Sequence, residues 1–243
     1  LALLVPLGWG LMFGAGLGAA GLGYAVAIVL WCQAASMAVY LWRAPRFADL
    51  GLFTRFDPPS WPPIRALLRL GLPMGVSVFM EGSLFVATAL LVGTLGTTQM
   101  AAHQIAILMA SLCFMVPLGV AMATTVRVGH AVGAGDLPGV RWSAAAGFSL
   151  GMIAQTISAV LLIVGATWVA SLFTTDPAVI ALASLLMAYA AVFQYPDGLQ
   201  ALSAGSLRGL KDTRVPMFIT VLAYWGFGLP LGAWLGISQG QGA

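Results

Sequence analysis

The sequence has 243 residues, of which 60% are hydrophobic and only 7% are charged, whereas about a quarter of the residues of an average soluble domain are charged. This composition excludes an ordinary soluble domain and predicts an all-α, polytopic membrane protein, a bundle of helices that cross a lipid bilayer. The net charge of +3 rests on ten Lys and Arg residues that cluster between apolar segments, so a nucleic-acid-binding face is not expected.

Seven apolar segments are candidate membrane spans, judged against the roughly 20 residues that a helix needs to cross a bilayer. In chain order they cover residues 1–13, 19–42, 67–95, 100–126, 142–173, 177–207 and 215–235. Thr175, Asp176 and Pro177 form a helix-start signal for the sixth segment. The chain opens inside the first apolar run without an initiator Met, so we expect a fragment of a longer protein.

The basic residues set the expected orientation of these segments. All ten fall at the second, fourth and sixth junctions between segments, and the first, third and fifth junctions carry none. The positive-inside rule therefore predicts that the second, fourth and sixth junctions are cytoplasmic. The second junction, residues 43–64, is the only sizeable loop, and its prolines predict a linker between two helical bundles.

Two carboxylates, Glu81 and Asp197, lie inside the third and sixth segments, and neither segment has a basic residue in its interior. An unpaired charge at the bilayer centre costs at least about 2.5 to 3.5 kcal/mol, so such residues usually face a partner or a water-filled cavity. If the acids only joined helices, neutral amides would do so at lower cost. The pair therefore predicts a site that binds and releases H⁺ or Na⁺.

Other polar residues share a helical face with one of these acids or, in the fourth segment, with each other. The three stripes are Ser77, Glu81 and Thr88; Gln104 and Ser111; and Gln194, Asp197 and Gln200. This spacing predicts a shared hydrated cavity, although hydrogen bonding between helices explains the Gln and Ser residues about equally well. Three prolines inside the same segments predict helix kinks beside the cavity, namely Pro73, Pro117 and Pro196.

Patterns typical of enzymes are weak or missing. Gly16, Gly18 and Gly21 match the dinucleotide-binding pattern G-x-G-x-x-G, but this motif follows a membrane span and has no acidic residue near position 41, so it predicts a turn of small residues. The sequence has no nucleophile and base at usable spacing and no phosphate-binding loop. We therefore do not expect an enzyme.

Three ordered stretches carry a family signature: GLPMGVSVFMEGSLFVATALLVGTLGTTQMAAHQIA, FMVPLGVAMATTVRVGHAVGAGD and FQYPDGLQALSAGSLRGLKDTRVPM. Together they resemble the multidrug and toxic compound extrusion (MATE) family, in its bacterial NorM-like branch. The resemblance implies twelve helices in two lobes, of which this chain holds the fifth to the eleventh. It assigns residues 1–42 to the last two helices of the N-terminal lobe, residues 43–64 to a cytoplasmic linker, and residues 65–243 to the C-terminal lobe without its last helix.

Members of this family export cationic or amphipathic drugs in exchange for inward Na⁺ or H⁺. The resemblance therefore implies that Glu81 and Asp197 bind the coupling ion, as metal ligands if that ion is Na⁺, with no other cofactor. Some relatives have a tyrosine one turn before the second acid, where this chain has Phe193, with Tyr195 nearby. Both aromatic residues are thus candidates for the cavity lining.

The expected function is a cation-coupled antiporter that works by alternating access in the bacterial plasma (inner) membrane. Its expected partners are the lipid bilayer and small cationic or amphipathic drugs, with no nucleic acid, and we expect a monomer. One alternative is a flippase of related architecture for lipid-linked sugars, which would favour a strongly basic cavity. The other is a membrane scaffold that transports nothing and uses its acids only for assembly.

Overall fold

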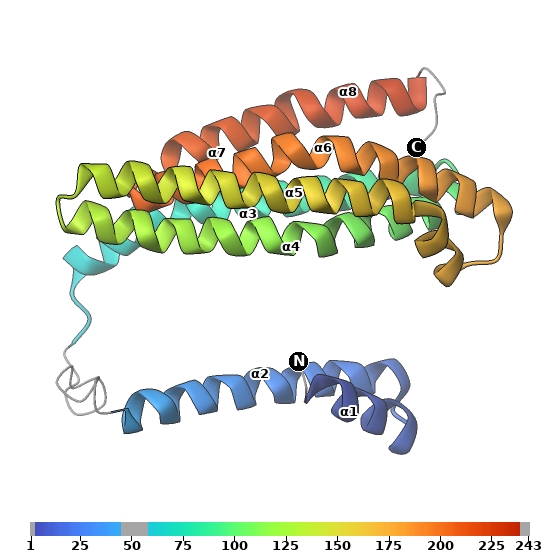
Figure 1. The fold of residues 1–243 in the computed structure, drawn as a ribbon. Helices are drawn as coiled ribbons and strands as arrows, with labels where there is room; N and C mark the ends of the chain where they lie inside the picture. Colours follow the sequence, from blue (N-terminus) through green and yellow to red (C-terminus); the bar gives the residue numbers. More distant parts are fainter. Residues whose placement is uncertain (1–2, 45–57, 239–243) are drawn as a thin grey trace. The chain divides into compact units, whose positions relative to one another are not determined.

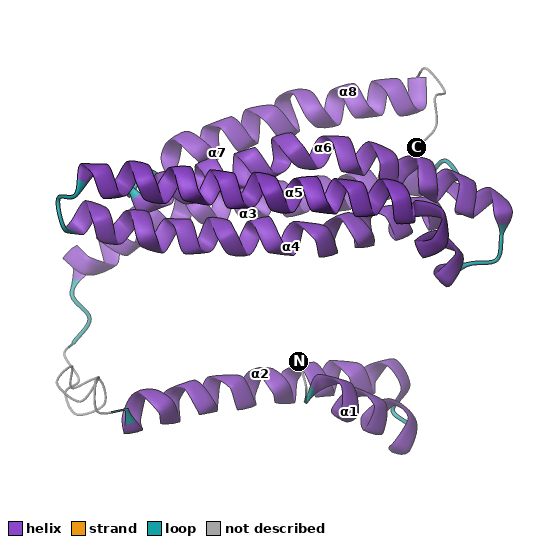
Figure 2. Cartoon of the chain, in the orientation of Figure 1, coloured by secondary structure: helices purple, strands orange, loops and turns teal. Residues whose placement is uncertain are grey.

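A computed structural model describes residues 3–44 and 58–238, and this described part consists of helices joined by short turns (Figures 1 and 2). Six helices within these ranges are long and apolar enough to cross a membrane, and a shorter apolar helix covers Leu4–Gly14. These seven correspond to the seven predicted segments, the first of them short. The expected all-α membrane bundle is therefore confirmed. The helices divide into two compact units, Leu1–Trp61 and Pro62–Ala243.

The first unit is a pair of apolar helices. Helix α1 (Leu4–Trp9) continues into a π-helical turn, η1 (Gly10–Gly14), and the chain then returns along α2 (Gly18–Arg43). Gly16 and Gly18 have φ angles of +67° and +55°, which favour glycine because a Cβ is strained there. Gly16 thus lies in a turn between two helices, whereas Gly18 begins α2 and Gly21 lies inside it, so the predicted turn covers only the first part of the motif. Most of the linker expected at 43–64 lies outside the described residues.

The second unit contains five membrane-length helical segments. Four are single α-helices: α3 (Trp61–Gly93), α4 (Thr97–Gly133), α5 (Leu137–Phe173) and α6 (Pro177–Gly209). The last begins as α7 (Arg214–Val221) and continues through η3 (Leu222–Gly228), α8 (Leu229–Ala233) and η4 (Trp234–Ser238). Helices α4, α5 and α6 pack against one another and hold the core, and α3 and the last span have few buried residues (Figure 1).

Aspartate side chains cap two of these helices at their N-termini. Asp176 Oδ1 accepts a hydrogen bond from Ala178 N at 2.9 Å, and Pro177 is the first residue of α6, which confirms the predicted start signal. Asp136 Oδ1 likewise accepts from Gly139 N at 2.9 Å, so α5 begins before the expected apolar segment. Helix α3 also begins early, at Trp61, because the prolines after it occupy the first turn, where no donor is needed.

Small residues let α4 and α6 approach closely. The core at this contact is rich in alanine, and a Cβ added to Gly205 would lie 2.7 Å from the carbonyl oxygen of Ala121. Thr125 Oγ1 donates across the same contact to the carbonyl oxygen of Gly205 at 2.8 Å. Close backbone approach and polar cross-links are the means by which helices associate in lipid, where apolar side chains alone gain little.

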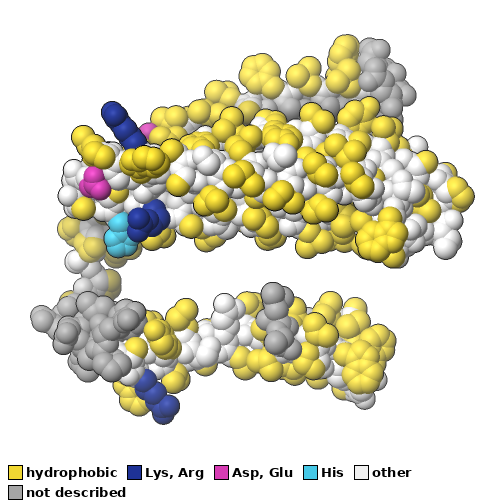
Figure 3. All heavy atoms as spheres, in the orientation of Figure 1, with side chains coloured by type: hydrophobic (Ala, Val, Ile, Leu, Met, Phe, Trp, Pro, Cys, Tyr) yellow, Lys and Arg dark blue, Asp and Glu magenta, His cyan; other side chains and the backbone are white. Residues whose placement is uncertain are grey.

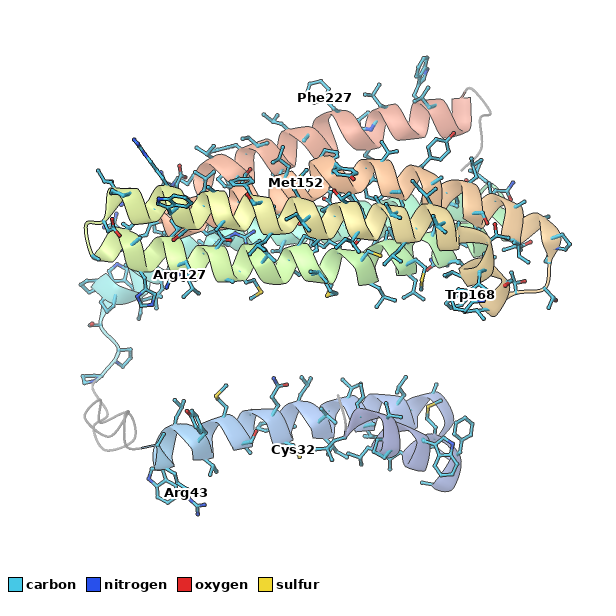
Figure 4. All side chains as sticks on the ribbon, in the orientation of Figure 1. Cys32, Arg43, Arg127, Met152, Trp168 and Phe227 are labelled. Carbon is cyan, nitrogen blue, oxygen red and sulfur yellow. The ribbon has the colours of Figure 1, made fainter. Side chains whose placement is uncertain are left out.

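Charged and aromatic residues mark the two ends of the second unit. The Lys and Arg side chains visible on the face in Figure 3 gather at one end of this unit. Figure 4 shows Arg127 at this end and Trp168 at the other. The placement agrees with basic residues at one membrane face and an interfacial tryptophan at the other.

Candidate functional site

Helices α3, α4 and α6 line a cavity of about 250 Å³ inside the second unit. Its lining combines two carboxylates, two other polar residues and seven apolar ones: Glu81, Phe85, Ile107, Ala110, Ser111, Phe114, Met115, Leu118, Phe193, Gln194 and Asp197. The two acids come from α3 and α6, 116 positions apart in the sequence (197 minus 81), and they interact electrostatically. Two negative groups in an apolar pocket can bind a small cation or a cationic organic molecule.

The cavity brings together five of the residues singled out from the sequence. Besides the two acids, Ser111, Phe193 and Gln194 lie in its lining. Gln194 is 1% exposed, whereas Phe193 is 44% exposed and Ser111 is also exposed. The polar stripe of the fourth segment therefore contributes one residue to the lining, and that of the sixth contributes two.

The other predicted cavity residues do not belong to this lining. The Ser77 hydroxyl donates to the carbonyl oxygen of Pro73 on its own helix at 3.0 Å. Tyr195 points to α5, where its hydroxyl donates to Thr156 Oγ1 at 3.2 Å. Gln200 faces the last span, Gln104 is exposed and Thr88 is half-buried. The expectation of one cavity shared by all the polar stripes is thus too broad.

The three expected kink prolines lie inside continuous helices. Pro73 is in α3, Pro117 is in α4 and Pro196 is in α6. Pro117 is fully buried, and Pro196 lines a second cavity between α6 and α7, together with Gln200 and Thr220. The proposed bending at these positions stays a prediction.

A buried amide of α5 holds α6 in place beside Asp197. Gln155 is completely buried, and its Nε2 donates to the carbonyl oxygen of Gln194. The Gln155 side chain occupies the space that a Cβ at position 198 would need, since such an atom would lie 2.5 Å from Gln155 Nε2. Gly198 therefore makes room for this contact, which fixes the main chain of α6 one turn before the carboxylate.

The π-helical segment of the last span contacts the elements that carry both acids. The Tyr224 hydroxyl donates to Gln200 Oε1 at 2.9 Å and also interacts with the Asp197 carboxylate. The neighbouring Trp225 Nε1 donates to the carbonyl oxygen of Met80, the residue before Glu81, at 3.2 Å. One short segment, η3, is thus joined to α6 and α3 at the positions of the two acids, and π-helical turns are frequent at functional sites.

Sequence reasoning missed Tyr224, Gln155 and the aromatic walls of the cavity. The phenol of Tyr224 and the amide of Gln155 lie inside apolar segments and could have been identified from the sequence, because buried polar groups need hydrogen-bond partners. The aromatic residues Phe85 and Phe114 gave no such signal, since apolar side chains are ordinary in a membrane span. Their place in the cavity depends on helix rotation, which the hydropathy pattern does not specify.

The sequence profile of the MatE family matches residues 73–234, which include both acids, all of α4 and α6, and α3 from Pro73 onward. The chain belongs to the MATE family. A MATE transporter crystallised in complex with MaL6 has the same fold, with a TM-score of 0.84 at 18% identity, over 96% of this chain and 53% of that one.

Curated MATE relatives place the chain in the NorM-like branch. It is 56% identical to "Probable multidrug resistance protein NorM" of Xanthomonas campestris pv. campestris, over 96% of this chain and 52% of that protein. The protein of the same name in Xylella fastidiosa is 52% identical, over 98% of this chain and 52% of the relative. "Multidrug resistance protein PmpM" of Pseudomonas aeruginosa is 39% identical, over 98% and 51%. The chain thus spans about half the length of these relatives.

Proposed function

We propose that this MATE chain forms part of a multidrug antiporter that exports cationic or amphipathic drugs from the bacterial cytoplasm in exchange for Na⁺ or H⁺. Transport proceeds by alternating access in the plasma membrane, without covalent chemistry. The relatives' printed names support drug resistance as the biological role. The observation that carries the coupling proposal is the pair of carboxylates, Glu81 and Asp197, in one largely apolar cavity.

The coupling proposal follows from the cost of placing two like charges together. Each carboxylate loses hydration inside the bundle, and the two repel each other, so a bound proton or Na⁺ stabilises the pair. A drug cation offers the same pair an alternative positive charge. An ion that binds one arrangement of the helices better than the other shifts their equilibrium, and this differential affinity is what alternating access requires.

The cavity chemistry disfavours the flippase alternative. A site for the anionic phosphates of lipid-linked sugars would gather Arg or Lys, but none of the described residues that line this cavity is basic. The sum of its formal charges is negative, which suits a cationic substrate. The scaffold alternative differs from our proposal in predicting no transport at all, so a transport assay separates the two.

Substitution of Asp197 tests the proposal directly. In the full-length protein that carries this sequence, Asp197→Asn keeps the size of the side chain but removes its charge. We expect this variant to insert into the membrane normally and to lose ethidium transport, because the neutral amide cannot take up and release the coupling ion. The measurement is ethidium movement in vesicles under an imposed Na⁺ gradient and, separately, under a pH gradient.

Asp136→Asn is the matched control. Its carboxylate is exposed and caps α5, and an asparagine oxygen caps a helix about equally well. We expect this variant to transport ethidium normally. Normal drug resistance in cells that carry Asp197→Asn would refute the role proposed for the acid, and failure of the unsubstituted protein to respond to either gradient would favour the scaffold.

A further inference from the structure

A groove of about 390 Å³ lies between α4 and α5 in the second unit, and we call it the α4–α5 groove. Figure 4 shows Arg127, one of its lining residues, at the end of the unit opposite Trp168. The groove shares no lining residue with the acidic cavity. The proposed transport mechanism therefore does not explain it.

Small residues create the groove. Gly147 of α5 lies against Thr124 of α4, and a Cβ at position 147 would collide with Thr124 Oγ1, so the two helices approach closely there. Beside this contact the lining includes Ala123, Ser143 and Ala146, whose side chains are too short to fill the space between the helices. The result is a hollow along the pair of helices into which an apolar chain can pack.

One end of the groove carries hydrogen-bond donors without partners. These donors are the Arg127 guanidinium, the Trp142 indole N–H and the Ser143 hydroxyl. None of these side chains forms a hydrogen bond or an ion pair with any described residue. Arg127 and Trp142 are exposed and Ser143 is half-buried, so a ligand can reach all three. Guanidinium and indole groups donate but do not accept hydrogen bonds, so this end favours a group rich in acceptors, such as a phosphate.

The opposite end of the groove is apolar. Leu150 lies eight positions after Trp142 on α5 (150 minus 142), and Val120 lies seven positions before Arg127 on α4 (127 minus 120). At the rise of an α-helix, these spacings separate the apolar end from the donors by about 10 to 12 Å. A ligand that fits the whole groove is therefore amphiphilic, with acceptor atoms at one end and an apolar chain at the other.

The charge of the groove distinguishes it from other cavities of this unit. Arg127 lies in its lining, and no described residue of the lining is acidic. The described linings of the acidic cavity and of the cavity between α6 and α7 contain no Lys or Arg. The groove lies at the end where basic side chains gather on the face in Figure 3, which the positive-inside rule assigns to the cytoplasm. Lipid headgroups of the cytoplasmic leaflet carry a net negative charge, so this groove is complementary to them.

We propose that the α4–α5 groove binds one anionic phospholipid of the cytoplasmic leaflet. The phosphate accepts hydrogen bonds from Arg127, Trp142 and Ser143, and one acyl chain lies along Ala146 toward Leu150. The bound lipid contacts both α4 and α5 and thereby stabilises their packing near the junction that joins them. This site is separate from the acidic cavity and does not rest on the proposed function.

Thermal unfolding of the purified full-length protein that carries this sequence tests the site, because a ligand that binds only the folded state raises the melting temperature. The probes are phosphatidylglycerol and phosphatidylethanolamine with identical acyl chains, each titrated into the detergent micelles, and inorganic phosphate. We expect phosphatidylglycerol to raise the melting temperature until the site is saturated. Phosphatidylethanolamine has no net negative charge and should have a smaller effect at the same mole fraction, and inorganic phosphate, which lacks an acyl chain, should have none.

Two substitutions locate the effect in the groove. Arg127→Gln removes the charge of an exposed side chain, and we expect the mole fraction of phosphatidylglycerol that gives half of the maximal effect to rise about 5-fold or more, as for the loss of one arginine from a contact with anionic lipid. Ala146→Leu keeps the arginine and fills the groove from an exposed position, and we expect a similar rise. Arg141→Gln is the matched control, because it removes the same charge from an exposed residue outside the lining, and it should leave the titration unchanged.

The outcomes leave the antiporter proposal untouched, because the assay requires no transport. Equal effects of the two lipids, or an equal effect of inorganic phosphate, would overturn the assignment of an anionic phospholipid. An unchanged titration for both Arg127→Gln and Ala146→Leu would mean that the groove does not hold the lipid, and an equal shift for Arg141→Gln would indicate diffuse attraction to the basic end instead of a site. A response specific to phosphatidylglycerol that weakens in both groove variants and not in the control supports the proposal.

Discussion

At the scale of single residues, Tyr224 occupies an unusual position between two acceptors. Its hydroxyl has one hydrogen to donate, and the described structure directs it to Gln200 Oε1 at 2.9 Å, while the Asp197 carboxylate also interacts with this hydroxyl. A hydroxyl with one donor cannot serve both acceptors at once. The last span is thereby linked to α6 at Gln200, close to the acid, and this link should contribute both to stability and to ion binding.

Tyr224→Phe removes the hydroxyl and leaves the ring in place. We expect the free energy of unfolding to fall by about 0.5 to 1.5 kcal/mol, the usual net value of a hydrogen bond. We also expect the half-saturating concentration of a coupling proton to fall, because Asp197 loses a hydrogen-bond donor that stabilises its charged form. Thermal unfolding and ethidium transport at graded ion concentrations measure these two effects. Tyr189→Phe, which alters an exposed ring on α6, should change neither, and equal effects from both variants would contradict this prediction.

At the scale of helices, the contact between α4 and α6 depends on the absence of side chains. A Cβ at position 205 would lie 2.7 Å from the Ala121 carbonyl oxygen, so Gly205→Ala must push the helices apart or break the nearby bond from Thr125. We expect a loss of about 1 to 3 kcal/mol, typical of overpacking. Gly119→Ala on α4 is the control, since a Cβ there meets nothing within 4 Å. This change should stabilise the helix slightly, because alanine favours helix more than glycine does.

Unfolding midpoints of the two purified variants check this prediction. A Gly205→Ala protein as stable as the unsubstituted one would mean that the α4–α6 contact adjusts without cost. A destabilised Gly119→Ala protein would mean that the effect at 205 reflects glycine replacement in general.

The helices themselves could be predicted from the sequence more fully than their contacts. Lipid requires every backbone group to be satisfied within the helix, so an apolar run of sufficient length specifies a span. The ends of the helices were predicted less accurately. Helix α4, for example, continues past Arg127 to Gly133, beyond the apolar run that predicted it. The two acids were identifiable because charge in an apolar segment is costly. A prediction that both acids face one cavity also requires the rotation of α3 and α6 about their axes. An apolar sequence contains little information about this rotation.

At the scale of the whole molecule, the second unit has two chemically different ends. Arg127 and Arg141 flank the junction between α4 and α5, whereas the junction between α5 and α6 has no basic residue from Ser171 to Ile180. Lys and Arg are retained on the cytoplasmic side during insertion, so the first of these junctions should face the cytoplasm and the second the periplasm. The drug export proposed above would then require substrate entry from the end that carries the arginines.

Single cysteines at the two junctions test this orientation. In the full-length protein, every native cysteine, including Cys32 and Cys113, is first replaced by alanine. Leu137→Cys and Thr175→Cys then each place a thiol at an exposed position, the first at the start of α5 and the second between α5 and α6. We expect a membrane-impermeant maleimide added to spheroplasts to label the thiol at 175 and not the thiol at 137. Permeabilised cells should show labelling of both, which controls for thiol reactivity. The reverse labelling pattern in spheroplasts would mean that the protein has the opposite orientation in the membrane. The direction of transport proposed here would then be wrong.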